Sequence, residues 1–134
     1  MKADIVVKGI IKNSNTNRIL IVQRSHTDPV GAGTWENIGG NVEDGEDLEE
    51  GLRREIREEV GITDIDIKNV AYVTLVDGKE PFLIVAYLCE TKTEEVQLSV
   101  EHKSYLWADE TECRSRLPKA IIEDFEKNGI WKML

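Results

Sequence analysis

The chain has 134 residues, 40% of them hydrophobic and 32% charged, which is enough for one substantial core and too little for two. Its 17 Lys and Arg against 26 Asp and Glu give a net charge of −9, so binding of duplex nucleic acid through a basic face is not expected. Cys89 and Cys113 are too few for a disulfide framework, no signal-peptide pattern opens the sequence, and the longest apolar run, 82–89, is too short for a membrane span. We expect one cytoplasmic domain over residues 1–134, with no membrane partner.

Short apolar runs separated by turn residues predict a chain rich in β-strands. Asn13 to Asn17 have turn chemistry between the first two runs, and Asp77-Gly78 marks a hairpin between two later ones. Residues 25–44 contain repeated Pro, Gly and Asn breaks, which predict a long loop of the kind that often carries function. Strands are expected at residues 5–11, 18–24, 65–67, 70–76, 82–89 and 105–107.

Two amphipathic helices are expected, and the clearer one covers residues 46–60, where apolar residues repeat every four positions. Asp44 is its expected N-cap, and Gly61 is suited to end it. The second helix is expected at 117–127, with Pro118 in its first turn. The order β–β–α–β–β–β–α does not alternate as βαβ units do, so we expect an α+β fold with a mixed sheet covered by helices.

Three carboxylates gather on one side of the first helix. Glu55, Glu58 and Glu59 lie within about 100° of one another and overlap the edge of the apolar stripe. A helix that only solvates a surface would turn its glutamates away from the core. Clustered carboxylates repel one another, so a positive partner is expected among them, and their oxygens suit a hard divalent cation, Mg²⁺ or Mn²⁺.

A simpler explanation of these glutamates is an acidic, solvated helix face held by Glu49–Arg53 and Glu50–Arg54 ion pairs. Gly51 is unusual on such a helix, because Gly in a helix interior costs about 1 kcal/mol relative to Ala. The absence of a side chain there makes room for a closely packed loop or a ligand beneath the carboxylates.

The segment from Gly40 to Ile62 resembles the Nudix box, G-x5-E-x7-R-E-U-x-E-E-x-G-U with U an aliphatic residue, at every fixed position. The flanks also look like MutT-type members of that family, although Ile38 stands where many members have Pro. The resemblance implies an α/β/α sandwich and Mg²⁺-dependent hydrolysis of a nucleoside diphosphate linked to another group. The matched positions are Gly40, Glu46, Arg54, Glu55, Ile56, Glu58, Glu59, Gly61 and Ile62.

The same resemblance implies a metal site. Glu55, Glu58 and Glu59, together with the carbonyl group of Gly40, would hold Mg²⁺, with Mn²⁺ as a substitute. Glu101, far along the chain, resembles the additional carboxylate of the family that binds metal or accepts a proton from water. The resemblance implies that these four glutamates, together with Arg54, are catalytic.

Other residues are implied to support this site or to contact the substrate. Arg54 would pair with neighbouring carboxylates and orient them, and Glu46 would join that support. Arg24 resembles a phosphate contact, which suits the forked donors of a guanidinium group. The residues expected at the substrate are Arg24, Trp35, Gly39 and Gly40.

Several of these assignments have ordinary structural alternatives. Trp35 is as readily a packing anchor for its loop as a platform for a base. The alternative for Arg24 is a charged side chain that keeps a strand edge in solution, and the alternative for Glu101 is a loop residue without a role in the site. His26 and His102 are expected to face solvent and to have no catalytic role.

The leading hypothesis is a Mg²⁺-dependent pyrophosphohydrolase that converts a nucleoside triphosphate, or a related nucleotide, to the monophosphate and pyrophosphate. One alternative is hydrolysis of another nucleoside diphosphate derivative, such as a nucleotide sugar, ADP-ribose or a dinucleotide. A second is a non-catalytic nucleotide-sensing module with the same fold. The expected partner is a small nucleotide, and a homodimer is a default for soluble enzymes that no residue here supports.

Overall fold

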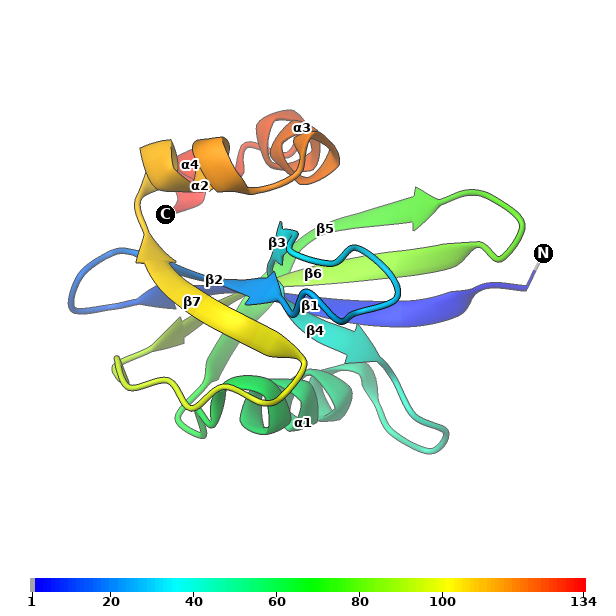
Figure 1. Ribbon diagram of the computed structural model, residues 1–134, viewed down its shortest axis with the longest axis horizontal. Helices are drawn as coiled ribbons and strands as arrows, with labels where there is room; N and C mark the ends of the chain where they lie inside the picture. The colour runs from blue at the N-terminus through cyan, green and yellow to red at the C-terminus, as the bar shows by residue number, and fades with distance from the viewer. Residues whose placement is uncertain (1) are drawn as a thin grey trace.

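A mixed β-sheet lies between helices on both of its faces in the computed structural model, which describes residues 2–134 (Figure 1). Met1, the first residue of the expected domain, lies outside the described residues. The strands are β1 (Asp4–Asn13), β2 (Ile19–Arg24), β3 (Trp35–Glu36), β4 (Ile38–Asn41), β5 (Asp66–Val76), β6 (Phe82–Thr91) and β7 (His102–Ala108). The helices are α1 (Leu48–Val60), α2 (Glu110–Arg116), α3 (Lys119–Lys127) and α4 (Ile130–Met133).

Strand β1 is the centre of the sheet. It runs parallel to β6 along its whole length and pairs antiparallel with β2 and β4. The strand order is β3-β2-β1-β6-β5, with β7 added to β2 and β4 added to β1. The turn between β1 and β2 contains Asn17 at a φ of 59°, a left-handed conformation that Asn tolerates. One parallel pair among antiparallel ones confirms the expected mixed sheet and α+β class.

Side chains from the two faces of the sheet form two separate buried clusters. On one face, Leu52, Ile56 and Val60 of α1 are fully buried against strand residues that include Val7. On the other face, Phe125 of α3 is fully buried in a cluster with residues of β1, β2 and β5. Figure 1 shows α1 on one side of the sheet and α2, α3 and α4 on the other. The expected α/β/α sandwich is therefore confirmed.

Residues 25–44 were expected to form a loop, but the structure has two short strands there, β3 and β4. The loop prediction was therefore wrong for the residues of these strands. In β4, a Cβ added at Gly39 would lie 1.9 Å from the carbonyl oxygen of Val7. Only Gly allows the two backbones to approach this closely. The paired glycines that look like a loop in the sequence are what let β4 join the sheet.

Strand β5 is one long strand, although two runs separated by polar residues had suggested two strands. Its register against β6 shifts between Ile67 and Asn69 and again between Val70 and Tyr72. Each shift inserts an extra residue into β5, which breaks the alternation of apolar and polar positions. The two bulges therefore hid the continuity of this strand.

The end of the chain folds into three helices, where one was expected at 117–127. Pro118 is the N-cap of α3, and α2 lies before it. Helix α2 has the polar sequence ETECRSR and buries only Cys113, so it has no apolar stripe to predict it. Its start does carry a signal, the capping box formed by Asp109 and Glu112. No helix in the described part of the chain combines the length and apolar character of a membrane span.

Helix α1 begins two residues later than expected, and its N-cap is Asp47, not Asp44. The Asp47 carboxylate accepts the backbone N–H of Glu50 at 2.8 Å, and Glu50 completes a capping box. Replacing Asp47 by Ala is expected to lower the free energy of unfolding by about 1 kcal/mol. Urea unfolding measures this, with Asp44→Ala in the preceding turn as the control that should cost little. Equal losses in the two variants would contradict the cap assignment.

Candidate active site

A cavity of about 370 Å³ opens where α1 faces β4 and the ends of β2 and β7. Six of the predicted site residues line it, namely Arg24, Gly39, Gly40, Glu55, Glu59 and Glu101. Arg24 and His102, which are 78 positions apart in the chain, meet here because β2 pairs with β7. The complete lining is Arg24, Asp28, Glu36, Gly39, Gly40, Asn41, Glu55, Glu59, Glu101 and His102.

The three glutamates of α1 have different environments. Glu59 is buried, and its carboxylate accepts the backbone N–H of Gly39 at 3.1 Å. Burial raises the pKa of Glu59 to about 7, and burial also raises the pKa of Glu55. Glu58 is more than half exposed and lies outside the cavity lining, beside Arg54. Glu59 and Glu55 therefore carry the costly buried charge of the site, and a cation would relieve that cost.

Gly40 lies against the carboxylate of Glu55. A Cβ added at Gly40 would lie 2.7 Å from the Glu55 carboxyl carbon, closer than real Cβ contacts allow. Gly40→Ala is therefore expected to displace Glu55 and to weaken Mg²⁺ binding about tenfold while the fold is kept. Calorimetric titration with Mg²⁺ tests this. The control is Gly9→Ala on β1, where an added Cβ has no neighbour closer than 3.4 Å; equal affinities in the two variants would contradict the prediction.

Arg54 holds the outer carboxylates together. Its Nε and Nη2 atoms donate to both oxygens of Glu46, at 2.6 and 3.0 Å. Its Nη1 atom donates to Glu55 at 3.0 Å and to Glu58 at 3.2 Å, and Nη2 also donates to the carbonyl group of Asn41 at 3.0 Å. The supporting role expected for Arg54 and Glu46 agrees with these contacts, which tie α1 to the chain before it.

The two ion pairs of the simpler surface-helix explanation do not form among the described residues. Arg53 instead donates to the carbonyl group of Ile65 at 2.6 Å. Gly51 is buried, and a Cβ there would lie 3.1 Å from a Glu46 oxygen and 3.4 Å from Val42. The missing side chain therefore makes room for the loop before α1, one of the two uses expected for it.

Glu36 and His102 are site residues that the sequence did not reveal. His102 is buried, so the expectation that it faces solvent was wrong, whereas His26 is exposed as expected. The Glu36 carboxylate accepts from Nζ of Lys8 at 3.1 Å, Nε of Arg24 at 2.9 Å and Nε2 of His102 at 3.0 Å. Burial acts to raise the pKa of Glu36, but these partners outweigh it and hold the pKa at about 2.

The contacts of Glu36 with Arg24 and His102 depend on strand pairing, which explains why the sequence did not predict them. Glu36 lies opposite Val22, a buried position of β2, so its side chain faces inward. His102 lies opposite Arg24 at a register shift between β2 and β7. The alternation of Trp35 and Glu36 across a short strand is the one sequence signal, and it is visible only once residues 35–36 are known to be a strand.

Trp35 does not line the cavity. It is partly buried against the core cluster on the opposite face of the sheet, and the guanidinium of Arg116 lies 5.8 Å from its ring centroid. These contacts agree with the packing-anchor alternative. They give no support to the alternative that Trp35 stacks on a base.

The donor set of the cavity fits a divalent cation. Glu59, Glu101 and His102 offer ligand atoms that lie within 4.8 Å of one another, and Glu55 adds another carboxylate to the wall. Oxygen ligands of this kind suit Mg²⁺ and Mn²⁺. A cation at this place would also offset the repulsion that clustered carboxylates exert on an anionic ligand.

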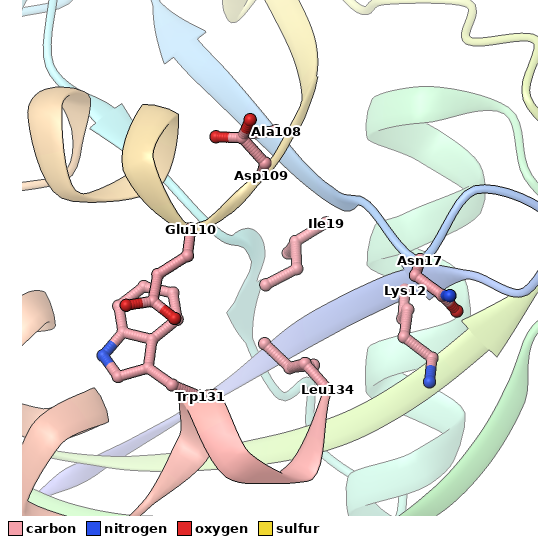
Figure 2. Close-up of a pocket in the computed structure, with 8 residues that line it drawn as sticks. All are labelled: Lys12, Asn17, Ile19, Ala108, Asp109, Glu110, Trp131 and Leu134. Atoms are coloured by element: carbon pink, nitrogen blue, oxygen red, sulfur yellow. The ribbon is translucent and has the colours of Figure 1, made fainter.

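A second cavity, of about 480 Å³, lies near the C-terminus (Figure 2). Its charged side chains already have partners: Asp109 caps α2, Glu110 pairs with Arg114 at 2.8 Å, and Lys12 pairs with Glu90 at 3.5 Å. Figure 2 shows the side chains of Glu110, Trp131 and Leu134 among those that border this cavity. This cavity therefore has no free polar cluster comparable to the one around Glu59.

Comparison with known proteins shows the family. The NUDIX domain model matches residues 4–125. Nucleoside triphosphatase NudI of Shigella flexneri is 33% identical, over 80% of this chain and 82% of that protein. MutT protein from Methanosarcina mazei Go1 has a TM-score of 0.79 at 29% identity, over 95% of this chain and 93% of that one. A C. elegans Ap4A hydrolase shares the fold, with a TM-score of 0.80 at 20% identity over 98% of both chains. The domain match and the identity to NudI confirm the resemblance seen in the sequence, and the chain belongs to the Nudix hydrolase family.

Proposed function

We propose that this chain is a Mg²⁺-dependent hydrolase that cleaves a nucleoside triphosphate to the monophosphate and pyrophosphate. The observation that carries the proposal is the convergence of Glu55, Glu59 and Glu101 on one cavity, with Glu59 buried and its pKa raised to about 7. NudI, the relative at 33% identity, is named as a nucleoside triphosphatase, which supports this substrate class over other nucleotides.

The residues around the cavity have separate tasks in this reaction. Glu55, Glu58, Glu59 and the carbonyl group of Gly40 would hold the cation, with Glu101 completing the set. A bound divalent cation neutralises phosphate charge and makes water a better nucleophile. Water adds across the phosphoric anhydride bond: a P–O bond to the water oxygen forms, the P–O bond that joins the monophosphate to the pyrophosphate breaks, and a water proton passes to a carboxylate, which we assign to Glu101.

The remaining residues place the substrate. Arg24 lines the cavity and can donate to a phosphate oxygen, while Gly39 and Gly40 form a wall without side chains beside which phosphates can lie. Arg54 and Glu46 keep the outer carboxylates in place. The protein thereby contributes orientation and fixed charges, which supply much of the catalysis of phosphoryl transfer. The proposal includes a cytoplasmic setting and a small nucleotide as the partner.

A hydrolysis screen with Mg²⁺ tests the proposal. The panel holds nucleoside triphosphates, oxidised triphosphates, ADP-ribose, nucleotide sugars and dinucleotides, with pyrophosphate and orthophosphate measured separately. Pyrophosphate release from triphosphates that is lost in Glu58→Gln is the expected result. Turnover confined to sugar or dinucleotide diphosphates would refute the substrate class. No turnover, with Mg²⁺ still bound, would favour a nucleotide-sensing module.

A further inference from the structure

One largely buried carboxylate, that of Glu36, accepts hydrogen bonds from three side chains on three different strands. Arg24 comes from β2, His102 from β7 and Lys8 from β1, and all three donate to it within 3.3 Å. The Glu36 side chain is only 14% exposed. Such a carboxylate can do more than stabilise the fold, because two of its partners, Arg24 and His102, also line the cavity.

We propose that Glu36 is a positioning residue: it fixes the Arg24 guanidinium and the His102 imidazole in the wall of the cavity, so that Arg24 presents a single N–H to a substrate phosphate. The proposal rests on the proposed function, which supplies the phosphate. Glu36 itself lines the cavity, but its carboxylate oxygens are occupied by these three side chains, so it acts through its partners.

A count of the Arg24 donors leads to the single N–H. A guanidinium group has five N–H donors. Nε and one Nη2 hydrogen are used by the two oxygens of Glu36, at 2.9 and 3.2 Å. The Nη1 atom donates to the carbonyl group of Val30 at 2.9 Å and to Asp28 at 3.4 Å. One Nη2 hydrogen is left for the cavity, so a forked contact from Arg24 to a phosphate, as the resemblance suggested, would require Glu36 to release it.

His102 is held in one tautomer by the same carboxylate. An ionised carboxylate only accepts hydrogen bonds, so Nε2 of His102, at 3.0 Å from Glu36, must carry the hydrogen. Nδ1 is buried and has no partner among residues 2–134. Glu36 therefore sets which ring nitrogen is protonated in the residue directly after Glu101.

Lys8 connects Glu36 to the start of β4. Its ammonium group donates to Glu36 at 3.1 Å and to the carbonyl group of Asn37 at 3.3 Å. Asn37 lies directly before β4, whose Gly39 donates to Glu59 at 3.1 Å. The Glu36 carboxylate is thus connected by short contacts to both walls of the cavity, the one formed by β4 and the one formed by β2 and β7.

The test compares Glu36→Gln with Glu90→Gln, a matched control on β6 whose carboxylate pairs with Lys12 and Lys68 at 3.5 and 3.4 Å, outside the cavity lining. NMR of the full chain without substrate follows the Nε–H signal of Arg24 and the ring-nitrogen signals of His102. Wild type and Glu90→Gln are expected to show a protected Arg24 signal and one His102 tautomer. Glu36→Gln is expected to lose both.

Kinetics give the second readout. Glu36→Gln is expected to raise KM for the triphosphate about tenfold with little change in kcat, because placement of a binding group is lost. A merely structural role would lower the folded fraction, and hence kcat, without raising KM. Arg24→Ala should then raise KM in wild type and add little in Glu36→Gln. If Glu36→Gln does not fold, Glu36→Asp keeps the charge, shortens the reach and should show the same pattern.

The outcomes separate the two proposals. Unchanged Arg24 and His102 signals in Glu36→Gln would overturn the positioning role, and so would an unchanged KM. If no nucleotide is turned over, the proposed function fails, while the NMR signals still decide whether Glu36 places the two side chains.

Discussion

Replacing Glu59 by Gln is expected to lower kcat for nucleotide hydrolysis by about 10³-fold, because the buried carboxylate at the centre of the site would no longer balance a cation. Gln has the same size as Glu, and its oxygen can still accept the Gly39 N–H that lies 3.1 Å from Glu59. The loss should therefore come without unfolding. Steady-state kinetics with Mg²⁺ in excess measure it.

The same variant has an expected effect on stability that depends on pH. Burial raises the pKa of Glu59 to about 7, above the ordinary value of 4.5 that applies to the unfolded chain. Between these values the native state binds a proton that the unfolded state has lost, so the contribution of Glu59 to stability falls as pH rises from 4.5 to 7. Gln cannot ionise. The free energy of unfolding of the Glu59→Gln variant should therefore exceed that of wild type above pH 7 in metal-free buffer.

The control for both effects is Glu49→Gln, an exposed residue on the same helix. It is expected to keep kcat within about twofold and to show no such pH-dependent gain, since surface substitutions have small effects. Glu59→Gln with wild-type kcat would contradict the assignment of Glu59 to the site. A stability difference that shrinks as pH rises would contradict the raised pKa.

Replacing Phe125 by Ala is expected to destabilise the fold by about 3–5 kcal/mol, the range for large aromatic side chains in a core. Phe125 is fully buried on the face of the sheet opposite α1 and contacts two aromatic rings edge-on, Tyr72 at 6.4 Å and Trp131 at 5.1 Å between centroids. Ala would leave a cavity where α3 and α4 meet the sheet. Urea unfolding at 25 °C measures the loss.

Val100→Ala is the matched control, because Val100 is 96% exposed and its truncation should change the free energy of unfolding by less than about 0.5 kcal/mol. Phe125 lies far from the carboxylate cavity, on the other face of the sheet, so the folded fraction of Phe125→Ala should retain wild-type KM. A loss below 1 kcal/mol would show that α3 does not depend on this ring, contrary to its packing.

The Nudix-box spacing was sufficient to predict that Glu55 and Glu59 meet at the cavity, whereas Glu58, which was predicted with them, lies outside its lining. Glu55 and Glu59 follow from the helical period, because one turn separates them on the side that faces the core. The box also predicted that Gly40 lies beside them, although they are more than ten positions apart in the chain. Because Glu55 and Glu59 lie on one helix, the sequence of that helix is enough to predict how they are arranged.

Strand pairing carries the rest of the site and was not predictable in the same way. Glu36 and His102 meet because β3 and β7 lie on either side of β2, with a register shift next to Arg24. Pairing partners and register depend on contacts between segments more than sixty residues apart, and a single sequence does not show them. Helix α2 was not predicted for a different reason: it buries only Cys113, so no apolar residues repeat at the helical period.

The two bulges in β5 have a consequence for the concentrated protein. This strand lies at the edge of the sheet, and three of its apolar side chains, Val70, Val73 and Leu75, are 43–54% exposed. A straight edge of this kind would be a template on which further chains add strand by strand into aggregates. The extra residues twist the edge and misalign its hydrogen-bonding groups, so an incoming strand finds no long ladder to join. The irregularity that obscured β5 in the sequence is thus expected to help keep the enzyme dispersed.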